Sequence, residues 1–191
     1  MKVRHIARES KLLMAVRRIL SVEDAADAEI LRQQSAKVGT VDQKINKLVR
    51  DMTDTMFEVE GVGIAAIQIG VPLQVMVVRA MRDAEDEETT RTMVLINPTV
   101  TQVSPKLEED FDGCLSVPGY WGLTDRSVFM RVGYQNRFGR WINGRFEGYL
   151  ARVVQHEIDH LRGILYTDHI SDPEKFYEVV EEDEPSVVSS E

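Results

Sequence analysis

The chain has 191 residues, 43% of them hydrophobic and only six of them proline, so we expect one globular domain with a core of ordinary size. Its 23 basic and 32 acidic residues give a formal net charge of −9, which disfavours binding of nucleic acid through a positive field over the whole surface; a local basic patch stays open. Cys114 is the lone cysteine, so the chain forms no internal disulfide, and a reducing cytoplasm suits it best.

The N-terminal part predicts three helical segments. Apolar residues recur at helical spacing over residues 10–20, and charged residues interrupt the apolar runs, so we expect neither a signal peptide nor a membrane span. A capping box opens a second segment, residues 21–39. Thr40 and Gln43 form another capping box before a stronger helix, which we expect to end before Gly61.

Strands are predicted next, from valine-rich or alternating sequence, at residues 73–79, 93–96 and 128–134. The second of these is expected to end at Asn97-Pro98. The acidic stretch 81–91 indicates a solvated hairpin loop, and residues 136–139 indicate a turn.

A last helix is predicted over residues 148–161, and Gly163 ends it. We expect the acidic tail, residues 181–191, to be disordered and residues 1–180 to form a single catalytic domain. Helices, then antiparallel strands, then one helix indicate the α+β class.

The last helix contains an HExxH motif, residues 156–160. Four residues along a helix rotate by roughly 40° net and rise about 6 Å, so His156 and His160 can face one ion. Glu157 lies about 100° further round, where its carboxylate can approach a metal-bound water without being a ligand, the position of a general base. The alternative is an ordinary helix with two hydrogen-bonded histidines.

Cys114 is the candidate third ligand. A thiolate and two imidazoles leave one tetrahedral position open to water, which indicates a catalytic metal site rather than a structural one. Taken alone, the thiol is better explained as a small, inert core residue.

The glycine-containing segment 61–68, GVGIAAIQ, would let a substrate backbone come close, and Gln68 offers a neutral amide donor. The segment lacks both the Gly-Lys-Ser/Thr ending and the complete GxGxxG spacing of nucleotide loops, which argues against a phosphate site. A plain turn between a helix and a strand stays open as an alternative.

Taken together, three segments resemble the peptide deformylase family. Its members carry a GxGΦAAxQ segment (Φ, aliphatic), an EGCLS segment and a QHExDHL segment in that order, and here these stand at residues 61–68, 112–116 and 155–161. The resemblance implies antiparallel β-sheets packed around a central HExxH helix, with N-terminal helices. It also implies a metal-dependent hydrolase that removes the formyl group from the initiator formyl-methionine of nascent polypeptides and releases formate.

The resemblance assigns roles to single residues. Cys114, His156 and His160 would bind the metal ion, and Glu157 would take a proton from the attacking water and pass it to the departing amine. The family stabilises the developing oxyanion with the motif glutamine and with the main-chain N–H after the cysteine, which are Gln68 and Leu115 here.

The peptide is bound in this family as an added strand beside the glycine-containing segment, so Val62 and Gly63 are expected to be its main-chain partners. The methionine side chain enters an apolar pocket, for which Val62, Tyr149 and Val153 are candidates. Tyr149 and Val153 lie one or two helical turns before the first motif histidine, and a core role suits them equally well.

The chain departs from the family in four places. Asp112 replaces the motif glutamate, which is expected to support the site from behind the ligands. Trp121 stands where many members have an arginine that contacts the peptide backbone. Residues 21–39 form an atypical helical insertion, and the acidic tail lacks the basic extension with which some members dock on the ribosome.

A thiolate with two imidazoles suits Fe²⁺, Zn²⁺, Ni²⁺ or Co²⁺, and the resemblance favours one Fe²⁺ per chain. The expected partner is the formyl-Met nascent peptide, with a transient ribosome contact left open and no membrane or nucleic acid involved. One rival is an HExxH protease that cuts internal peptide bonds, against which the segments around Cys114 and Gln68 argue. The other is a binding protein that has lost the chemistry, and the complete set of ligands argues against it.

Overall fold

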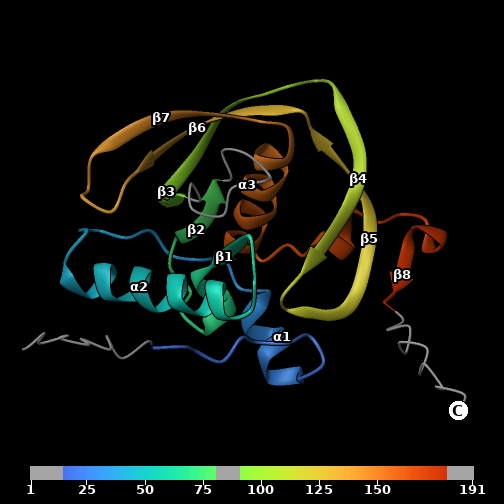
Figure 1. Ribbon diagram of the computed structural model, residues 1–191, viewed down its shortest axis with the longest axis horizontal. Helices are drawn as coiled ribbons and strands as arrows, with labels where there is room; N and C mark the ends of the chain where they lie inside the picture. The colour runs from blue at the N-terminus through green and yellow to red at the C-terminus, as the bar shows by residue number, and fades with distance from the viewer. Residues whose placement is uncertain (1–14, 81–90, 180–191) are drawn as a thin grey trace, which may run out of the picture.

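Two antiparallel sheets enclose a central helix (Figure 1). The computed structural model describes residues 15–80 and 91–179. Its helices in these ranges are α1 (Ala25–Leu31), α2 (Gln43–Glu58), α3 (Gly148–Leu161) and the short 3-10 turns η1 (Ala66–Ile69), η3 (Tyr166–His169) and η4 (Pro173–Lys175). α3 contacts strands of both sheets, which confirms the predicted α+β class with sheets around the HExxH helix.

The larger sheet has the strand order β1-β2-β3-β6-β7, so β1 lies at one edge. Its strands are β1 (Gly63–Ala65), β2 (Val75–Ala80), β3 (Arg91–Val103), β6 (Phe129–Gln135) and β7 (Trp141–Glu147). The smaller sheet has the order β4-β5-β8. Its strands are β4 (Leu107–Cys114), β5 (Val117–Ser127) and β8 (Phe176–Glu178). All pairings between these strands are antiparallel.

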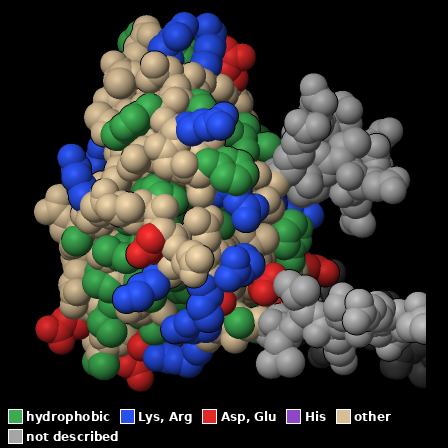
Figure 2. Space-filling view, turned by 90° about the vertical axis from the view of Figure 1, so that its left-hand side faces the viewer, with side chains coloured by type: hydrophobic (Ala, Val, Ile, Leu, Met, Phe, Trp, Pro, Cys, Tyr) green, Lys and Arg blue, Asp and Glu red, His purple; other side chains and the backbone are tan. Residues whose placement is uncertain are grey.

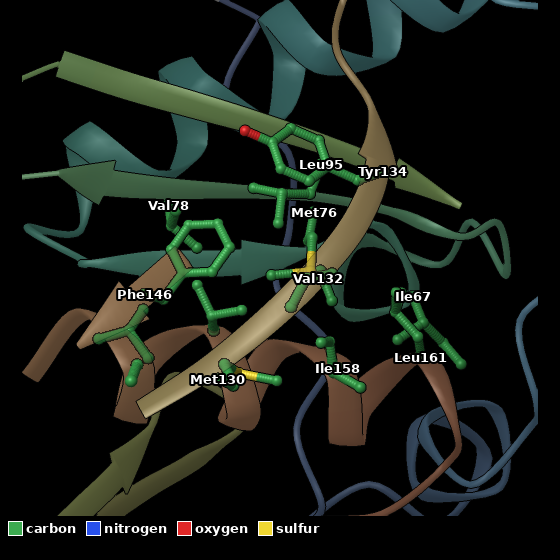
Figure 3. Packing of buried hydrophobic residues seen from close by; sticks show 14 residues of the cluster. Ile67, Met76, Val78, Leu95, Met130, Val132, Tyr134, Phe146, Ile158 and Leu161 are labelled. Carbon is green, nitrogen blue, oxygen red and sulfur yellow. The ribbon is translucent and has the colours of Figure 1, made fainter. Parts of the chain in front are cut away.

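α3 is held by its apolar residues. Ala151, Val154, Ile158 and Leu161 follow helical spacing and are buried against the large sheet. Figure 3 shows this core, in which side chains of α3 meet those of β2, β3, β6 and β7. Gly163, at φ +74°, ends the helix where a side chain would collide with main-chain atoms of Arg32. The predicted helix and its end are confirmed.

A second core cluster fixes α2 on the large sheet. Its apolar residues recur at positions 45, 48, 49, 52 and 56, and they pack against residues of β1, β2 and β3. The helix starts two residues later than a Thr40 cap would place it, because Asp42 is the cap and its side chain accepts hydrogen bonds from the N–H groups of Lys44 and Ile45. The helix itself and its end before Gly61 are confirmed.

The N-terminal predictions are largely wrong. Residues 15–20 of the predicted helix 10–20 are not helical, since Arg17 and Leu20 use their main-chain N–H groups on Thr55 and Gln68; residues 10–14 lie outside the described ranges. In the predicted segment 21–39 only α1 is helical, with Asp24 as its cap. The rest of that segment hydrogen-bonds to other elements, which compete with the helix for its main-chain groups.

The predicted strands are present, but the second is longer than expected. β3 continues through Pro98 to Val103, with register shifts beside Asn97, which adopts φ +53°. The Asn97 side chain exchanges two 2.8 Å hydrogen bonds with the main chain of Val38, which stabilises the irregularity. The turn at residues 136–139 is confirmed. Residues 81–90 of the predicted acidic loop and the tail 181–191 lie outside the described residues.

The surface is not uniformly acidic. Figure 2 shows the face on the left of Figure 1, where Lys and Arg side chains gather in the lower half and hydrophobic side chains form small separate patches. Basic and acidic side chains are thus interspersed on this face of a chain whose net charge is −9. No helix within the described residues is long and apolar enough to cross a membrane.

Candidate active site

Cys114, His156 and His160 meet where the two sheets face α3. Cys114 ends β4, and the two histidines are one turn apart on α3 with ring centroids 4.9 Å apart. Cys114 Sγ lies 3.2 Å from His160 Nε2, and the potential ligand atoms of the three residues all lie within 4.8 Å of one another. The fold thus brings together the three predicted ligands.

The protonation of these groups suits a metal ion. Asp112 Oδ1 accepts a hydrogen bond from His156 Nδ1, 3.0 Å away, and this contact orients the ring so that Nε2 is the nitrogen that can bind an ion. Burial opposes ionisation of the Cys114 thiol, but His160 and His156 lower its pKa well below the usual value. A thiolate and two imidazole nitrogens at this spacing fit one divalent ion and leave room for further ligands.

Glu157 lies beside these three residues and is almost completely buried. Its Oε2 has no hydrogen-bond partner among the described residues, although a buried carboxylate oxygen normally has one. Burial raises the pKa of Glu157 to about 7, against the opposing effect of His156 and His160. Gly63 faces the carboxylate so closely that a Cβ at that position would overlap Oε1. The site therefore holds a proton-accepting group with an unused oxygen.

Gln68 has a fixed orientation at the opposite wall. Its Oε1 accepts a hydrogen bond of 2.8 Å from the main-chain N–H of Ala65, so its amide nitrogen points toward the site. That nitrogen lies 3.2 Å from Ser116 Oγ and 3.6 Å from Cys114 Sγ. The 3-10 turn η1 carries Gln68, and only 1% of the residue is exposed. The amide nitrogen thus has a fixed orientation toward the site, where it donates to Ser116 and Cys114.

A buried network lies behind His156. Asp112 Oδ2 accepts hydrogen bonds from Thr124 Oγ1 and from two nitrogens of Arg126, at 2.8–3.0 Å. Arg126 also donates to Asp159, whose second donor is His169 at 2.8 Å. Burial opposes ionisation of Asp112, but its bonds to His156 and Arg126 lower its pKa. The shorter acidic side chain at this position therefore reaches His156, Thr124 and Arg126 together.

A cavity of about 480 Å³ opens onto these groups. The predicted substrate residues Val62, Gly63, Tyr149 and Val153 all line it, and so does Leu115. Val153 is 6% exposed, whereas Tyr149 is 58% exposed and so is not the core residue that its helical spacing allowed. β1 is an edge strand, so the described sheet leaves one side of it available to a further strand.

Comparison with known proteins decides which family this geometry belongs to. A family model described as polypeptide deformylase matches residues 16–176. The chain belongs to the peptide deformylase family. The peptide deformylase of Chloroflexus aggregans is 36% identical over 186 residues, covering 93% of the chain and 99% of the relative. That of Agrobacterium fabrum is 41% identical over 142 residues, covering 74% of the chain and 82% of the relative.

Solved peptide deformylase structures share the fold. The enzyme of Ehrlichia chaffeensis in complex with actinonin superposes with a TM-score of 0.76 at 36% identity, covering 85% of this chain and 92% of that one. The Met-Ala-Ser-bound enzyme of Acinetobacter baumannii superposes with a TM-score of 0.74 at 30% identity, covering 83% and 100%. Peptide deformylases are metal-dependent hydrolases, and the chain is an enzyme that removes the N-formyl group from nascent polypeptides with release of formate.

Several buried polar residues of the site were not predicted from the sequence. Arg126 and Thr124 hold Asp112, and Arg152 donates four hydrogen bonds to oxygens of β4 and β5. Arg152 thereby ties the strand that ends at Cys114 to the helix that carries the histidines. The sequence could have predicted this role of Arg152, because the residue lies on the inner face of an amphipathic helix and a charged residue is rarely buried without a partner.

Proposed function

We propose that one divalent ion, held by Cys114, His156 and His160, serves the removal of the formyl group from the initiator formyl-methionine. The convergence of three ligand atoms within 4.8 Å, beside the unpartnered Oε2 of Glu157, carries this proposal. When bound, the ion would polarise the formyl carbonyl and lower the pKa of the attacking water.

The chain's own residues supply the remaining parts of the reaction. Glu157 accepts the proton of the attacking water and passes it to the nitrogen of the departing amine; its pKa of about 7 in the metal-free site suits both tasks. Gln68 Nε2 and the main-chain N–H of Leu115 donate to the formyl oxygen as charge develops on it. Each such donor is typically worth about 3 kcal/mol of transition-state stabilisation.

The peptide is proposed to bind as an added strand along the free edge of β1, with Val62 and Gly63 as main-chain partners. Its methionine side chain enters the cavity between Val62, Tyr149 and Val153. Gly63 supports this placement, because the lack of a side chain there keeps the space in front of Glu157 open. The Met-Ala-Ser complex of the Acinetobacter baumannii relative is consistent with a short methionine peptide as ligand.

Fe²⁺ is the proposed native ion, by resemblance to the family, although Zn²⁺, Ni²⁺ and Co²⁺ suit the same ligands. The unpaired thiol and the substrate support a reducing cytoplasm as the location, with transient contact to a translating ribosome. Residues 1–180 are proposed to form the catalytic domain.

Formate release from formyl-Met-Ala-Ser, measured with metal analysis on the same anaerobic preparation, tests the proposal. We expect stoichiometric iron, loss of activity in air and recovery with Ni²⁺ or Co²⁺. Air-stable activity with native zinc would refute iron as the native ion but would leave the proposed reaction intact. Cleavage of internal peptide bonds without formate release would refute the reaction itself.

A further inference from the structure

The hairpin of β6 and β7 is basic in an otherwise acidic chain. Residues 127–146 contain four arginines and no aspartate or glutamate, although the whole chain has 32 acidic residues. β3, which neighbours β6 in the large sheet, adds no acidic residue either. The positive charge of the hairpin is therefore not cancelled by its own sequence, and a local field of this sign attracts anions.

Strand pairing places arginines and a tryptophan on the outer face of this hairpin. Arg131 lies directly opposite Arg145, and Gln135 lies opposite Trp141. The alternate residues of β6 are buried in the core, so these pairs point away from it. α2 covers β1, β2 and β3, and the core cluster beneath it includes no residue of β6 or β7. Within residues 15–80 and 91–179, no helix covers the outer face of the hairpin (Figure 1).

Most of the charge on this face has no counter-charge. Two arginines directly opposite each other destabilise a sheet, and Arg131 and Arg145 form such a pair. Glu147 accepts a hydrogen bond of 2.6 Å from Arg145. Arg131, Arg137 and Arg140 form no ion pair with any carboxylate of the described residues. A polyanion that follows the hairpin would therefore neutralise charges that the fold leaves unpaired.

Exposed aromatic rings lie among these arginines. Trp141 is 66% exposed, and Phe138, in the turn of the hairpin, is 74% exposed. The guanidinium of Arg137 lies 5.5 Å from the centroid of the Phe138 ring, and that of Arg145 lies 4.9 Å from the centroid of the Phe129 ring. Open rings and guanidinium planes both stack on unpaired bases. Arginines that alternate with such rings are typical of surfaces that bind single-stranded nucleic acid.

We give the name basic hairpin face to the exposed arginines and large exposed rings of this hairpin: Arg131, Arg137, Phe138, Arg140, Trp141 and Arg145.

We propose that the basic hairpin face binds single-stranded RNA. Its arginines contact phosphates, and its two rings stack on unpaired bases. Asn143 and Thr99 are exposed in one row across β7, β6 and β3, where their polar groups can reach the 2′-hydroxyl that distinguishes RNA from DNA. No residue of the face lines the metal cavity, so RNA binding is a function separate from deformylation. The local basic patch that the net charge left open thus replaces the expectation that the chain contacts no nucleic acid.

Fluorescence anisotropy of a labelled oligo(U) RNA of about ten nucleotides, titrated with the metal-loaded full chain, tests the proposal. Contacts from three or four arginines predict a slope of log K against log salt of about −2 to −3. Replacing both Arg137 and Arg140 by alanine should make this slope shallower by about 1.4. Trp141→Ala should weaken binding at least about fivefold without changing the slope, and Trp141→Tyr should retain most of the affinity.

The matched control replaces Arg50 and Arg162 by alanine, since both are exposed arginines outside the hairpin. It removes the same charge and should leave the slope unchanged. All variants should release formate at the wild-type rate, because the altered residues lie outside the cavity lining.

Four results would overturn the inference. The first is no binding of oligo(U) at low salt, and the second is an equal change of slope in the control and hairpin double variants. The third is binding of the matching DNA oligomer as tight as that of RNA. The fourth is binding to vesicles of phosphatidylcholine and phosphatidylserine without binding to RNA. The binding assay needs no turnover, so a failure of the proposed function would not affect its outcome.

Discussion

Asp112→Asn is expected to weaken both metal binding and the fold. Asp112 accepts four hydrogen bonds, from His156, Thr124 and two nitrogens of Arg126. An asparagine of the same shape has one acceptor oxygen and one NH₂ group, so either His156 or Arg126 then faces a donor. In one orientation His156 loses the acceptor that fixes its tautomer. In both orientations Arg126, which is 5% exposed, keeps only Asp159 as a counter-charge.

Typical magnitudes for such changes set the expected size of both effects. Loss of a carboxylate behind a ligand histidine typically costs about 10- to 100-fold in metal affinity. Removing one partner of a buried ion pair costs about 3 kcal/mol. At roughly 2–4 °C per kcal/mol for a chain of this size, the melting temperature should fall by roughly 6–12 °C.

Competition with a chelator measures the affinity, and thermal unfolding of the metal-free protein measures the stability. Asp168→Asn serves as the control, because Asp168 pairs with Arg32 where the side chains are 39% and 46% exposed. This half-exposed pair should contribute less than about 1 kcal/mol. Wild-type metal affinity in Asp112→Asn, together with an unchanged melting temperature, would show that the network does not position His156.

Three further predictions concern the same region. Glu157→Ala should retain the metal and lose about 10²- to 10⁴-fold in kcat; turnover within tenfold of wild type, measured by formate release, would contradict its proton-transfer role. Gly63→Ala should lower kcat/KM at least about tenfold and destabilise by roughly 1–3 kcal/mol in urea, since the added methyl overlaps the Glu157 carboxylate. Gly39→Ala, which meets no atom within 4 Å, should change neither quantity, and equal effects of the two would count against a steric cause. Burial opposes ionisation of Asp159, but its partners His169 and Arg126 lower its pKa below 3.8. The ionised carboxylate therefore stabilises the fold above about pH 4, and this contribution is lost as the pH falls through the lowered pKa. Asp159→Asn should therefore be less stable than wild type at neutral pH and should lose less stability between about pH 5 and pH 2. Thermal unfolding of both proteins across this pH range measures the effect. Parallel curves of stability against pH would refute the linkage.

Local patterns in the sequence were sufficient to predict those helices and strands that bury one face against the core. The spacing of Ala151, Val154, Ile158 and Leu161 predicts α3 because a helix buries residues of this period whatever lies opposite. The same regular geometry places His156 and His160 on one side. The sequence pattern does not give the range of β4, because its first five residues are all exposed and no alternation of buried and exposed positions marks it as a strand.

Hydrogen bonds to distant elements decided the rest. Residues 15–20 have the apolar spacing of a helix, yet their N–H groups bond to Thr55 and Gln68, and these partners are not encoded in any local pattern. The sequence by itself identified the candidate ligands and Glu157, through motifs whose chemistry is local. Only the tertiary structure set Cys114 Sγ 3.2 Å from a histidine 46 residues away and joined Arg126 to Asp112 and Asp159. These contacts depend on how strands and helix pack together, because that packing alone sets distances between residues far apart in the chain.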